Sequence, residues 1–402
     1  MTKKYIVRQN IINKISPFIG DSLIKVITGQ RRVGKSYVLF QIIDQILELK
    51  PDSNIIYINK EDYKFDNINT YIDLIKYTDE HFIEKANNCL FIDEIQDIEN
   101  FEKALRHFQN SEKYDIYCTG SNAHLLSGEL ASYLSGRYVQ IRIFSLSYKE
   151  FLIFHKLKDS DEALLKYIQF GGMPHLINLK NKADVYKEYL KNIINTIVLH
   201  DIIARYNIRN IRFLQDLLKF VADNVGSLIT AKRISDYLKS QKISIQPRTV
   251  IDYLNYVESV FFIERVSRTE IQGRKIFEIG DKFYFEDLGL RHSIIPYRQS
   301  DINKILENLI YHQLRIWDYE VFVGKQADKE IDFVADKNGQ TMYFQVAYLI
   351  IDKNTHQREF GNLLSIKDNF RKIVVSMDKQ IGYSIYKGIE HWNIRDFLLN
   401  FK

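Results

Sequence analysis

The sequence has few of the residues that cross-link or stiffen a chain: 2 cysteines and 5 prolines among 402 residues. So few cysteines exclude a disulfide scaffold, and we expect Cys89 and Cys118 to be buried structural residues rather than a redox pair. The scarcity of proline argues against long stiff linkers between domains, and no low-complexity tract or internal repeat is visible. Reduced cysteines predict a cytoplasmic protein.

Long apolar runs are also missing. No stretch approaches the roughly 18 apolar residues that span a bilayer, and the start Met1-Thr2-Lys3-Lys4-Tyr5 lacks the apolar core of a secretion signal. The 10 histidines show no metal-ligand spacing, so no zinc site is expected. A net charge of +5 is small for this length, and by itself it does not indicate nucleic-acid binding.

What the sequence does contain is enough apolar material for real cores, 46% of all residues. A chain of this length predicts two or three domains. In residues 1–150, short apolar runs alternate with helical patterns, which predicts an α/β fold with a parallel sheet covered by helices on both faces. We expect the strands near residues 23–28, 54–59, 89–92, 115–119 and 139–143.

A complete phosphate-binding loop follows the first of these strands and precedes a helix, which is the context that such a loop requires. Its glycines let successive backbone N–H groups point at phosphate oxygens, and the helix N-terminus adds partial positive charge. Lys35 is expected to reach the β- and γ-phosphates, and the Ser36 hydroxyl to bind Mg²⁺. The predicted nucleotide-binding residues are Gly29, Gln30, Arg31, Arg32, Val33, Gly34, Lys35, Ser36 and Tyr37.

Polar residues follow two further strands of the predicted sheet, so they are expected at the same carboxyl edge as the loop. Asp93 is the expected second anchor for Mg²⁺, and Glu94 the group that orients or deprotonates the attacking water. Ser121 and Asn122 either hold the γ-phosphate or simply form a turn. Arg137 either stabilises transition-state charge, in cis or across a subunit boundary, or is a surface arginine.

These motifs resemble a known family. The segments that carry the resemblance are Gly29–Ser36, Phe91–Gln96, Thr119–Asn122, Leu134–Arg137 and Phe144–Phe151. They look like the prokaryotic AAA-type ATPases of the signal-transducing (STAND-like) group that carry a C-terminal domain of unknown function. The resemblance implies ATP rather than GTP, and a switch or remodelling role.

The rest of the chain predicts three further segments: a helical connector at 151–210, a winged-helix-like domain at 211–300 and an α/β domain at 301–402. Three helical patterns followed by two strand-like runs predict the winged helix. In a DNA-binding version its third helix would enter the major groove, and the alternative is a purely structural or protein-docking module. The outward positions of that helix are Gln246, Arg248, Thr249, Asp252, Asn255 and Glu258, a poor match for a polyanion. The predicted wing adds Arg265, Arg268, Arg274 and Lys275.

The last segment looks like the PD-(D/E)XK nuclease fold, with Glu307 and Asp332 as the expected acidic residues. An active enzyme of that fold takes a second carboxylate and a lysine from a Glu-x-Lys on the next strand, where this chain has Gln345-Val346-Ala347. An amide is a weak ligand for a hard cation, and alanine offers neither charge nor donor. We therefore expect a degenerate nuclease-like fold kept for binding or scaffolding.

The sequence as a whole predicts an ATP-hydrolysing molecular switch that uses ATP and Mg²⁺ and engages a protein partner, with no membrane association. Two alternatives stay open: an ATP-dependent DNA-binding protein of repair or mobile elements, and a nucleotide-binding scaffold without turnover. The partner, any DNA sequence preference, the oligomeric state and the trigger of hydrolysis are not predicted.

Overall fold

The computed structural model describes residues 5–123, 134, 136–180, 182–240, 243–271, 276–350, 352–378 and 383–401. The chain forms two compact units: the first contains residues 1–144 and 259–261, and the second contains residues 145–258 and 262–402. No described helix is both long and apolar enough to cross a membrane.

The first unit is built on a five-stranded sheet with the order β2-β3-β4-β1-β5. Every pairing in it is parallel, so all strands end at the same edge. The strands are β1 (Ile24–Thr28), β2 (Asn54–Asn59), β3 (Asn88–Asp93), β4 (Tyr114–Gly120) and β5 (Tyr138–Arg142). Because β4 lies between β1 and β3, its last residues lie between the end of β1, where the predicted phosphate loop begins, and the end of β3, where Asp93 lies.

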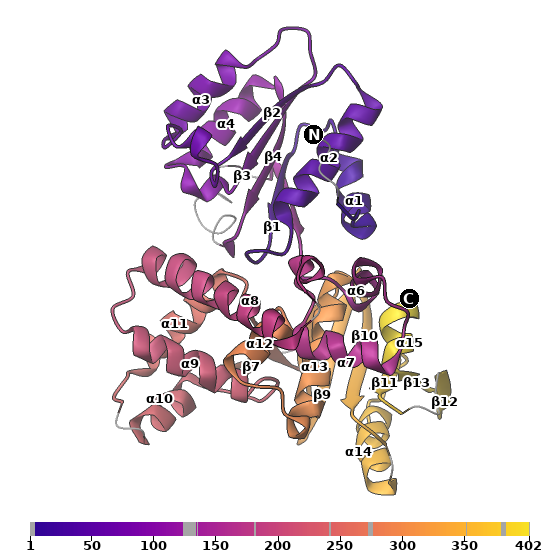
Figure 1. Ribbon diagram of the computed structural model, residues 1–402. Coiled ribbons are helices and arrows are strands. Elements are labelled where there is room, and N and C mark those ends of the chain that lie inside the picture. Colours follow the sequence, from indigo (N-terminus) through magenta and orange to yellow (C-terminus); the bar gives the residue numbers. More distant parts are fainter. Residues whose placement is uncertain are drawn as a thin grey trace. The chain divides into compact units, whose positions relative to one another are not determined.

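Helices cover both faces of this sheet, as the sequence predicts. Figure 1 shows α3 (Tyr71–Glu80) and α4 (Phe101–Ser111) on one face, with α1 (Gln9–Ile15) and α2 (Lys35–Leu49) on the other. Short 3-10 turns at Ser16–Phe18, Tyr63–Phe65 and Ile95–Asp97 complete the described elements of this unit. The side chains of α3 and α4 form one apolar core with the alternate strand residues that face them. Cys89 and Cys118 are free and buried, as expected, and burial raises the pKa of each thiol to about 12.

The second unit begins with a helical part. It contains α6 (Tyr148–His155), α7 (Asp161–Phe170), α8 (Ala183–Thr196), α9 (Ile211–Asp223), α10 (Ala231–Ser240) and α11 (Pro247–Ser259). A 3-10 turn lies at Pro174–Asn178, and a π-helical segment, Ile197–Ala204, extends α8. Asn210 caps α9 by accepting from Phe213 N–H, and Pro247 is the first residue of α11, where its missing N–H has no helical partner to lose.

The second sheet has eight strands in the order β12-β13-β11-β10-β9-β8-β6-β7. They are β6 (Ile263–Glu270), β7 (Ile276–Phe285), β8 (Glu320–Gln326), β9 (Lys329–Lys337), β10 (Gln340–Ala347), β11 (Arg371–Ser376), β12 (Tyr383–Tyr386) and β13 (Ile389–Asn393). Helices α12 (Leu288–Ile294) and α13 (Ile302–Ile316) and the 3-10 turn Gln299–Asp301 lie between β7 and β8, α14 (Lys353–Leu364) lies between β10 and β11, and α15 (Ile394–Asn400) follows β13.

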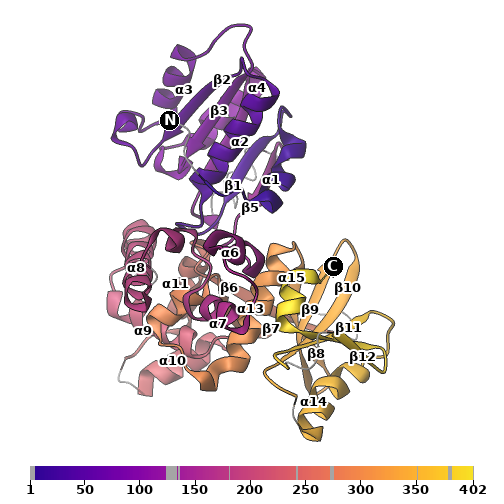
Figure 2. The same ribbon diagram turned by 45° about the vertical axis from the view of Figure 1, so that its right-hand side comes forward.

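Helices lie on both faces of this sheet as well (Figure 2). Phe344 and Gln345 are neighbours on β10 and therefore point to opposite faces. The Phe344 ring packs at 5.9 Å from that of Phe397 on α15, whereas Gln345 Nε2 donates to Glu359 Oε2 on α14 at 2.9 Å. Thus α15 covers one face and α14 the other.

The predicted order of three helices and a hairpin is present as α9, α10, α11 and the antiparallel pair β6–β7. The hairpin also pairs with β8, which joins it to the sheet of the C-terminal segment. The three predicted segments after residue 150 therefore lie within one unit. Their division into domains, the winged helix and the nuclease-like fold stay predictions.

Candidate functional site: a phosphate loop with an acidic pair

The predicted phosphate loop connects β1 to α2 with the backbone conformations that such a cradle needs. Gly29 has φ +154°, and a Cβ there would lie 2.2 Å from the Ile143 carbonyl oxygen, so only glycine fits. Gly34, with φ +100°, is the N-cap of α2, and Arg32 also has a positive φ, of 71°. The first N–H groups of α2 have no partner inside the helix and are available to an anion.

Lys35 is the first residue of α2, and its ammonium is held under the loop. Nζ donates to the carbonyl oxygens of Gly29 at 3.2 Å and Gln30 at 3.3 Å. It also lies 3.2 Å from Glu94 Oε1, so the phosphate-loop lysine and the second acid of the β3 end form an ion pair. Both side chains are buried.

The two acids and Thr119 form a compact network at the carboxyl ends of β3 and β4. Thr119 Oγ1 donates to Asp93 Oδ1 at 2.5 Å and accepts from Glu94 N–H at 2.9 Å. Tyr57, on β2, donates to the other oxygen of Asp93 at 3.1 Å. Glu94 adopts a left-handed conformation (φ +56°), and Gln96 Nε2 donates to its Oε2 at 2.5 Å. These hydrogen bonds fix the orientations of the Asp93 and Glu94 carboxylates.

The surroundings shift the pKa values of the two acids in opposite directions. Burial raises the pKa of Asp93, and the hydrogen bonds from Ser36 and Thr119 only partly oppose it. Burial would also raise the pKa of Glu94, but the Lys35 ammonium, with Gln96 and Arg31, outweighs it, so this pKa lies below its ordinary value. A pair with separated pKa values is common where acids have different chemical roles.

Polar atoms near this edge are buried without a protein partner. The Ser121 hydroxyl and both amide atoms of Gln30 make no hydrogen bond within the described part of the chain. Ser121 and Asn122 are buried directly after β4, at the end of the strand between β1 and β3. Unsatisfied buried groups are costly, and at a ligand site they are commonly satisfied by the ligand or by water.

The remaining loop residues differ in their exposure. Arg31 donates to Glu61 Oε1 at 2.7 Å, and Arg32 is exposed. Tyr37 is 51% exposed and stacks edge-on against Phe40. Val33 is fully buried.

Arg137 lies at the wrong end of the sheet for a role in cis. Its carbonyl oxygen accepts from Ile24 N–H at the start of β1, and Tyr138, which follows it, pairs with Ile24. The phosphate loop begins at the other end of β1, about 13 Å away at 3.3 Å per residue. The exposed guanidinium donates to Asn110 Oδ1 at 3.1 Å. The prediction that Arg137 acts within its own chain is therefore wrong, and a role in trans stays a prediction.

Two residues that sequence reasoning missed support the site. Tyr57 bonds Asp93, and Arg8, which is only 5% exposed, donates to the Val33 carbonyl of the phosphate loop at 3.3 Å. Neither is part of a recognisable motif. The one available signal for Arg8 is an arginine directly before an apolar helix.

The predicted acidic residues of the second sheet are also brought together, but around a lysine. Lys282 on β7 lies 3.1 Å from Glu307 Oε2 on α13 and 2.8 Å from Glu330 Oε1 on β9. Tyr284 also donates to Glu307, and Asp332 Oδ2 accepts from Val346 N–H at 2.8 Å. Gln345 Oε1 accepts from Asp332 N–H. Among the described residues no group of His, Cys, Asp or Glu side chains is arranged to hold a metal ion.

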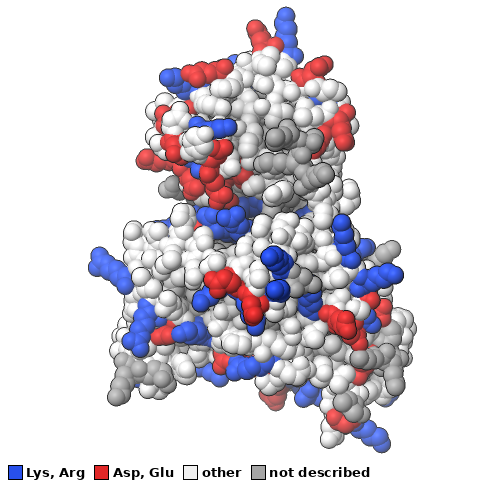
Figure 3. Space-filling view, in the orientation of Figure 1, with Lys and Arg blue, Asp and Glu red and all other residues white. Residues whose placement is uncertain are grey.

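One arginine of the predicted DNA-reading wing, Arg265, contacts side chains of its own unit. Arg265 Nε lies 3.5 Å from Glu258 Oε2, and its NH2 donates to Asn255 Oδ1 at 2.7 Å. Arg274 and Lys275 lie outside the described residues. On the face drawn in Figure 3, basic and acidic side chains are interspersed.

Comparisons with known proteins agree with the fold of the first unit. Residues 21–152 match the family described as AAA domain, and residues 161–301 match a domain of unknown function (DUF8612). The chain is 36% identical over 406 residues to an uncharacterized protein of Haemophilus influenzae, across 99% of this chain and 100% of that protein. It is 31% identical over 383 residues to an uncharacterized protein of Methanocaldococcus jannaschii, across 91% of this chain and 83% of that protein. The chain belongs to the family of these two proteins.

Among solved structures, the Walker-type ATPase of Pyrococcus abyssi is similar with a TM-score of 0.52. The similarity covers 72% of this chain and 96% of that one, at 13% identity, and it therefore concerns the fold. The first unit of this family member is an AAA-type P-loop domain.

Proposed function

We propose that this protein is an ATP-hydrolysing molecular switch of the AAA, STAND-like type that works with Mg²⁺. The observation that carries the proposal is the convergence of four groups at one sheet edge: a phosphate loop, Lys35, the acids Asp93 and Glu94, and the unsatisfied hydroxyl of Ser121. An AAA-type fold alone would also suit a protein that binds nucleotide without turnover. The buried, differently tuned acids favour catalysis.

The residues present fit a metal-bound triphosphate. The loop N–H groups and the α2 N-terminus would bind the phosphates, and the Ser36 hydroxyl with the Asp93 carboxylate would hold Mg²⁺. Bound Mg²⁺ neutralises charge on the phosphate oxygens. Asp93 is pre-oriented for this by its bonds from Thr119 and Tyr57.

Glu94 is the residue that we assign to the attacking water. Its carboxylate directly follows the Mg²⁺ anchor Asp93 at the carboxyl end of β3, where it can orient or deprotonate that water. In this structure its charge is paired with Lys35. A β- or γ-phosphate that draws the ammonium toward itself would release the carboxylate, so Glu94 becomes available only when a triphosphate is in place.

The switch role rests on how the chain runs. The second unit is connected to the AAA-type domain at residues 144–145, 258–259 and 261–262. A nucleotide-dependent change in the loop thus has covalent routes to the helices and the eight-stranded sheet. Phosphate loops commonly control such changes because the γ-phosphate orders neighbouring segments until it is hydrolysed.

The test is steady-state phosphate release from ATP and Mg²⁺, measured for the wild type and for Lys35→Ala. We expect slow turnover by the wild type and a loss of about 100-fold or more in the variant, because a preorganised charge on the transferred phosphate is removed. Far-ultraviolet circular dichroism and urea unfolding check that the variant is folded. Turnover that survives in folded Lys35→Ala would contradict the assigned site.

A further inference from the structure

Arg8 joins two peptide groups that are far apart in the sequence. Its NH1 atom donates to the carbonyl oxygen of Val33 at 3.3 Å and to that of Phe144 at 2.9 Å. The side chain is held in place because Arg8 is buried and its own N–H donates to Gln41 Oε1 on α2 at 3.0 Å. A guanidinium presents donors in a fixed plane, so such a double contact also fixes the distance between the two carbonyls.

The first of these peptide groups belongs to the phosphate loop. The Val33 carbonyl and the Gly34 N–H are parts of one planar unit, and no described peptide bond is cis. In a trans peptide the C=O and the N–H point in opposite directions. A cation that holds the Val33 oxygen therefore directs the Gly34 N–H away from itself, and a charge-assisted bond on one side of a peptide strengthens the donor on the other.

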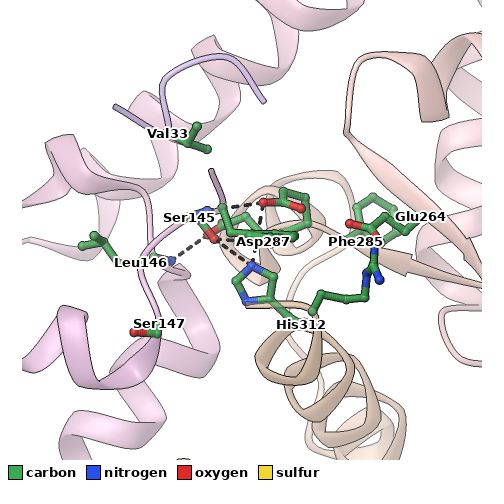
Figure 4. A network of polar contacts seen from close by, with 12 residues as sticks. Val33, Ser145, Leu146, Ser147, Glu264, Phe285, Asp287 and His312 are labelled. Atoms are coloured by element: carbon green, nitrogen blue, oxygen red, sulfur yellow. Dashed lines mark hydrogen bonds and ion pairs between the residues drawn. The ribbon is translucent and has the colours of Figure 1, made fainter. Parts of the chain in front are cut away.

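The second peptide group is the junction between the two units, since the boundary falls between Phe144 and Ser145. On the side opposite the Phe144 carbonyl, the Ser145 N–H donates to Glu286 Oε1 at 3.3 Å. The Ser145 hydroxyl donates to the Glu286 carbonyl at 3.3 Å and lies 3.4 Å from His312 Nε2. Figure 4 shows Ser145, Asp287 and His312 turned toward one another in the second unit.

Leu146, which follows the junction, is also fixed by hydrogen bonds within the second unit. Leu146 N–H donates to the Gly172 carbonyl at 2.8 Å, and Gly172 N–H donates to Asp287 Oδ2 at 2.7 Å. A Cβ at Gly172 would lie 2.3 Å from the Leu146 carbonyl oxygen, so this contact requires glycine. A displacement of the junction peptide would therefore also displace Leu146, which is hydrogen-bonded to Gly172 and through it to Asp287 in the second unit.

We propose that Arg8 is a positioning residue that aims the Gly34 N–H at the bound phosphates and couples their presence to the junction peptide 144–145. This inference deepens the proposed function and rests on it. When an anion takes the Gly34 N–H, the Val33–Gly34 peptide becomes more polarised, and the bond from Arg8 to Val33 strengthens. A guanidinium that is held more firmly at Val33 moves less, so its second bond, to the Phe144 carbonyl, restricts the junction peptide more when nucleotide is bound.

The experiment compares the wild type, Arg8→Met and Arg8→Lys. Calorimetric titration with Mg²⁺ and a non-hydrolysable ATP analogue gives the affinity, and hydrogen exchange read by mass spectrometry gives the protection of peptides that contain residues 144–147. We expect the wild type to bind and to slow exchange there on binding. Arg8→Met should bind about 10- to 100-fold more weakly, the range expected for a lost hydrogen bond to a charged group, and show no protection at saturating nucleotide.

Arg8→Lys separates positioning from charge. It keeps the cation but not the planar fork, so we expect intermediate affinity and protection. If Arg8→Met does not fold, Arg8→Lys decides alone by its protection at saturating nucleotide. Gln9→Ala is the matched control, because Gln9 is the next residue, is exposed at the start of α1 and donates only to Asn13 within the described contacts. It should behave as the wild type.

The outcomes distinguish the two proposals. A wild type that does not bind the analogue contradicts the proposed function. A wild type that binds, together with folded Arg8 variants of unchanged affinity and unchanged protection at 144–147, contradicts only the role of Arg8.

Discussion

Beside each of the two sheets a lysine lies against acidic side chains, but only one of the two clusters is arranged to bind a ligand. In the first, Lys35 contacts Glu94 beside the N-terminus of α2, whose first N–H groups have no partner within the helix. The nearby Ser121 hydroxyl makes no hydrogen bond within the described part of the chain. In the second, Lys282 lies between Glu307 and Glu330, and Asp332 is bonded to backbone. The first cluster has capacity left for a ligand, whereas the second is satisfied by its own chain.

The difference lies in the backbone rather than in the charged residues. Lys35 begins a helix after two glycines with positive φ, so amide donors converge on the space that its ammonium borders. Lys282 lies on the regular strand β7, which pairs with β6, and its ammonium lies against Glu307 and Glu330. The phosphate loop therefore offers N–H donors to an anion in addition to its lysine, whereas Lys282 is already paired with acids of its own unit.

The largest expected effect comes from changing the first cluster, which we expect to bind the ligand. Glu94→Gln should lower ATP turnover by about 100-fold or more, because the group that orients and deprotonates water is lost. Nucleotide affinity should be unchanged or higher, since the carboxylate no longer competes for Lys35. Phosphate release and calorimetric titration measure the two quantities.

The control is Glu99→Gln, an exposed acid a few residues further along the chain. If Glu94→Gln keeps wild-type turnover, the protein either uses another base or is the nucleotide-binding scaffold that the sequence also allowed.

The second prediction concerns the cluster around Lys282, whose charges are paired within the chain. Lys282→Met should lower the free energy of unfolding by about 3–5 kcal/mol, because removing one partner leaves Glu307 buried beside Glu330 without a counter-charge. Turnover per folded molecule should not change. Urea unfolding measures the first quantity, with the exposed Lys329→Met as control.

A loss below about 1 kcal/mol would mean that Lys282 is not the counter-charge of the cluster, as for an ordinary exposed pair. Binding of Mn²⁺ by the wild-type second unit would also contradict the comparison, since that cluster would then be open to a ligand.

The smallest effect concerns pH. Because burial raises the pKa of Asp93, its ionised form, which holds Mg²⁺, should be lost at a higher pH than for an ordinary aspartate as the solution is acidified. Thr119→Val removes a donor to the ionised form, so the acid limb of the pH–activity profile should move further up. Thr78→Val, whose lost hydroxyl donates to the Leu74 and Ile75 carbonyls in α3 and not to Asp93, should leave the limb in place. If the acid limb of the profile does not move in Thr119→Val, the ionisation of a group other than Asp93 determines its position.

The sequence predicted the parts of this fold that depend on local pattern. Strands β1 to β5, helix α2 and the gathering of the loop with Asp93, Glu94 and Ser121 at one edge follow from buried runs and from the rule that parallel strands end together. The displaced Arg137 could not be predicted, because its position depends on where β5 starts relative to β1.

Long-range partners were also out of reach. Arg8 meets Phe144 across 136 positions, and Lys282 meets Glu307 from a strand outside the nuclease-like motif. The edge strand β12 was missed because Tyr383–Tyr386 is exposed at every position and so lacks an alternating pattern.

The most direct test of the account is calorimetric titration of the wild-type protein with a non-hydrolysable ATP analogue, with and without Mg²⁺. The account predicts one site per chain, tighter binding with Mg²⁺, and loss of binding in Lys35→Ala. Absence of binding in the presence of Mg²⁺, or equal binding by folded Lys35→Ala, would contradict it.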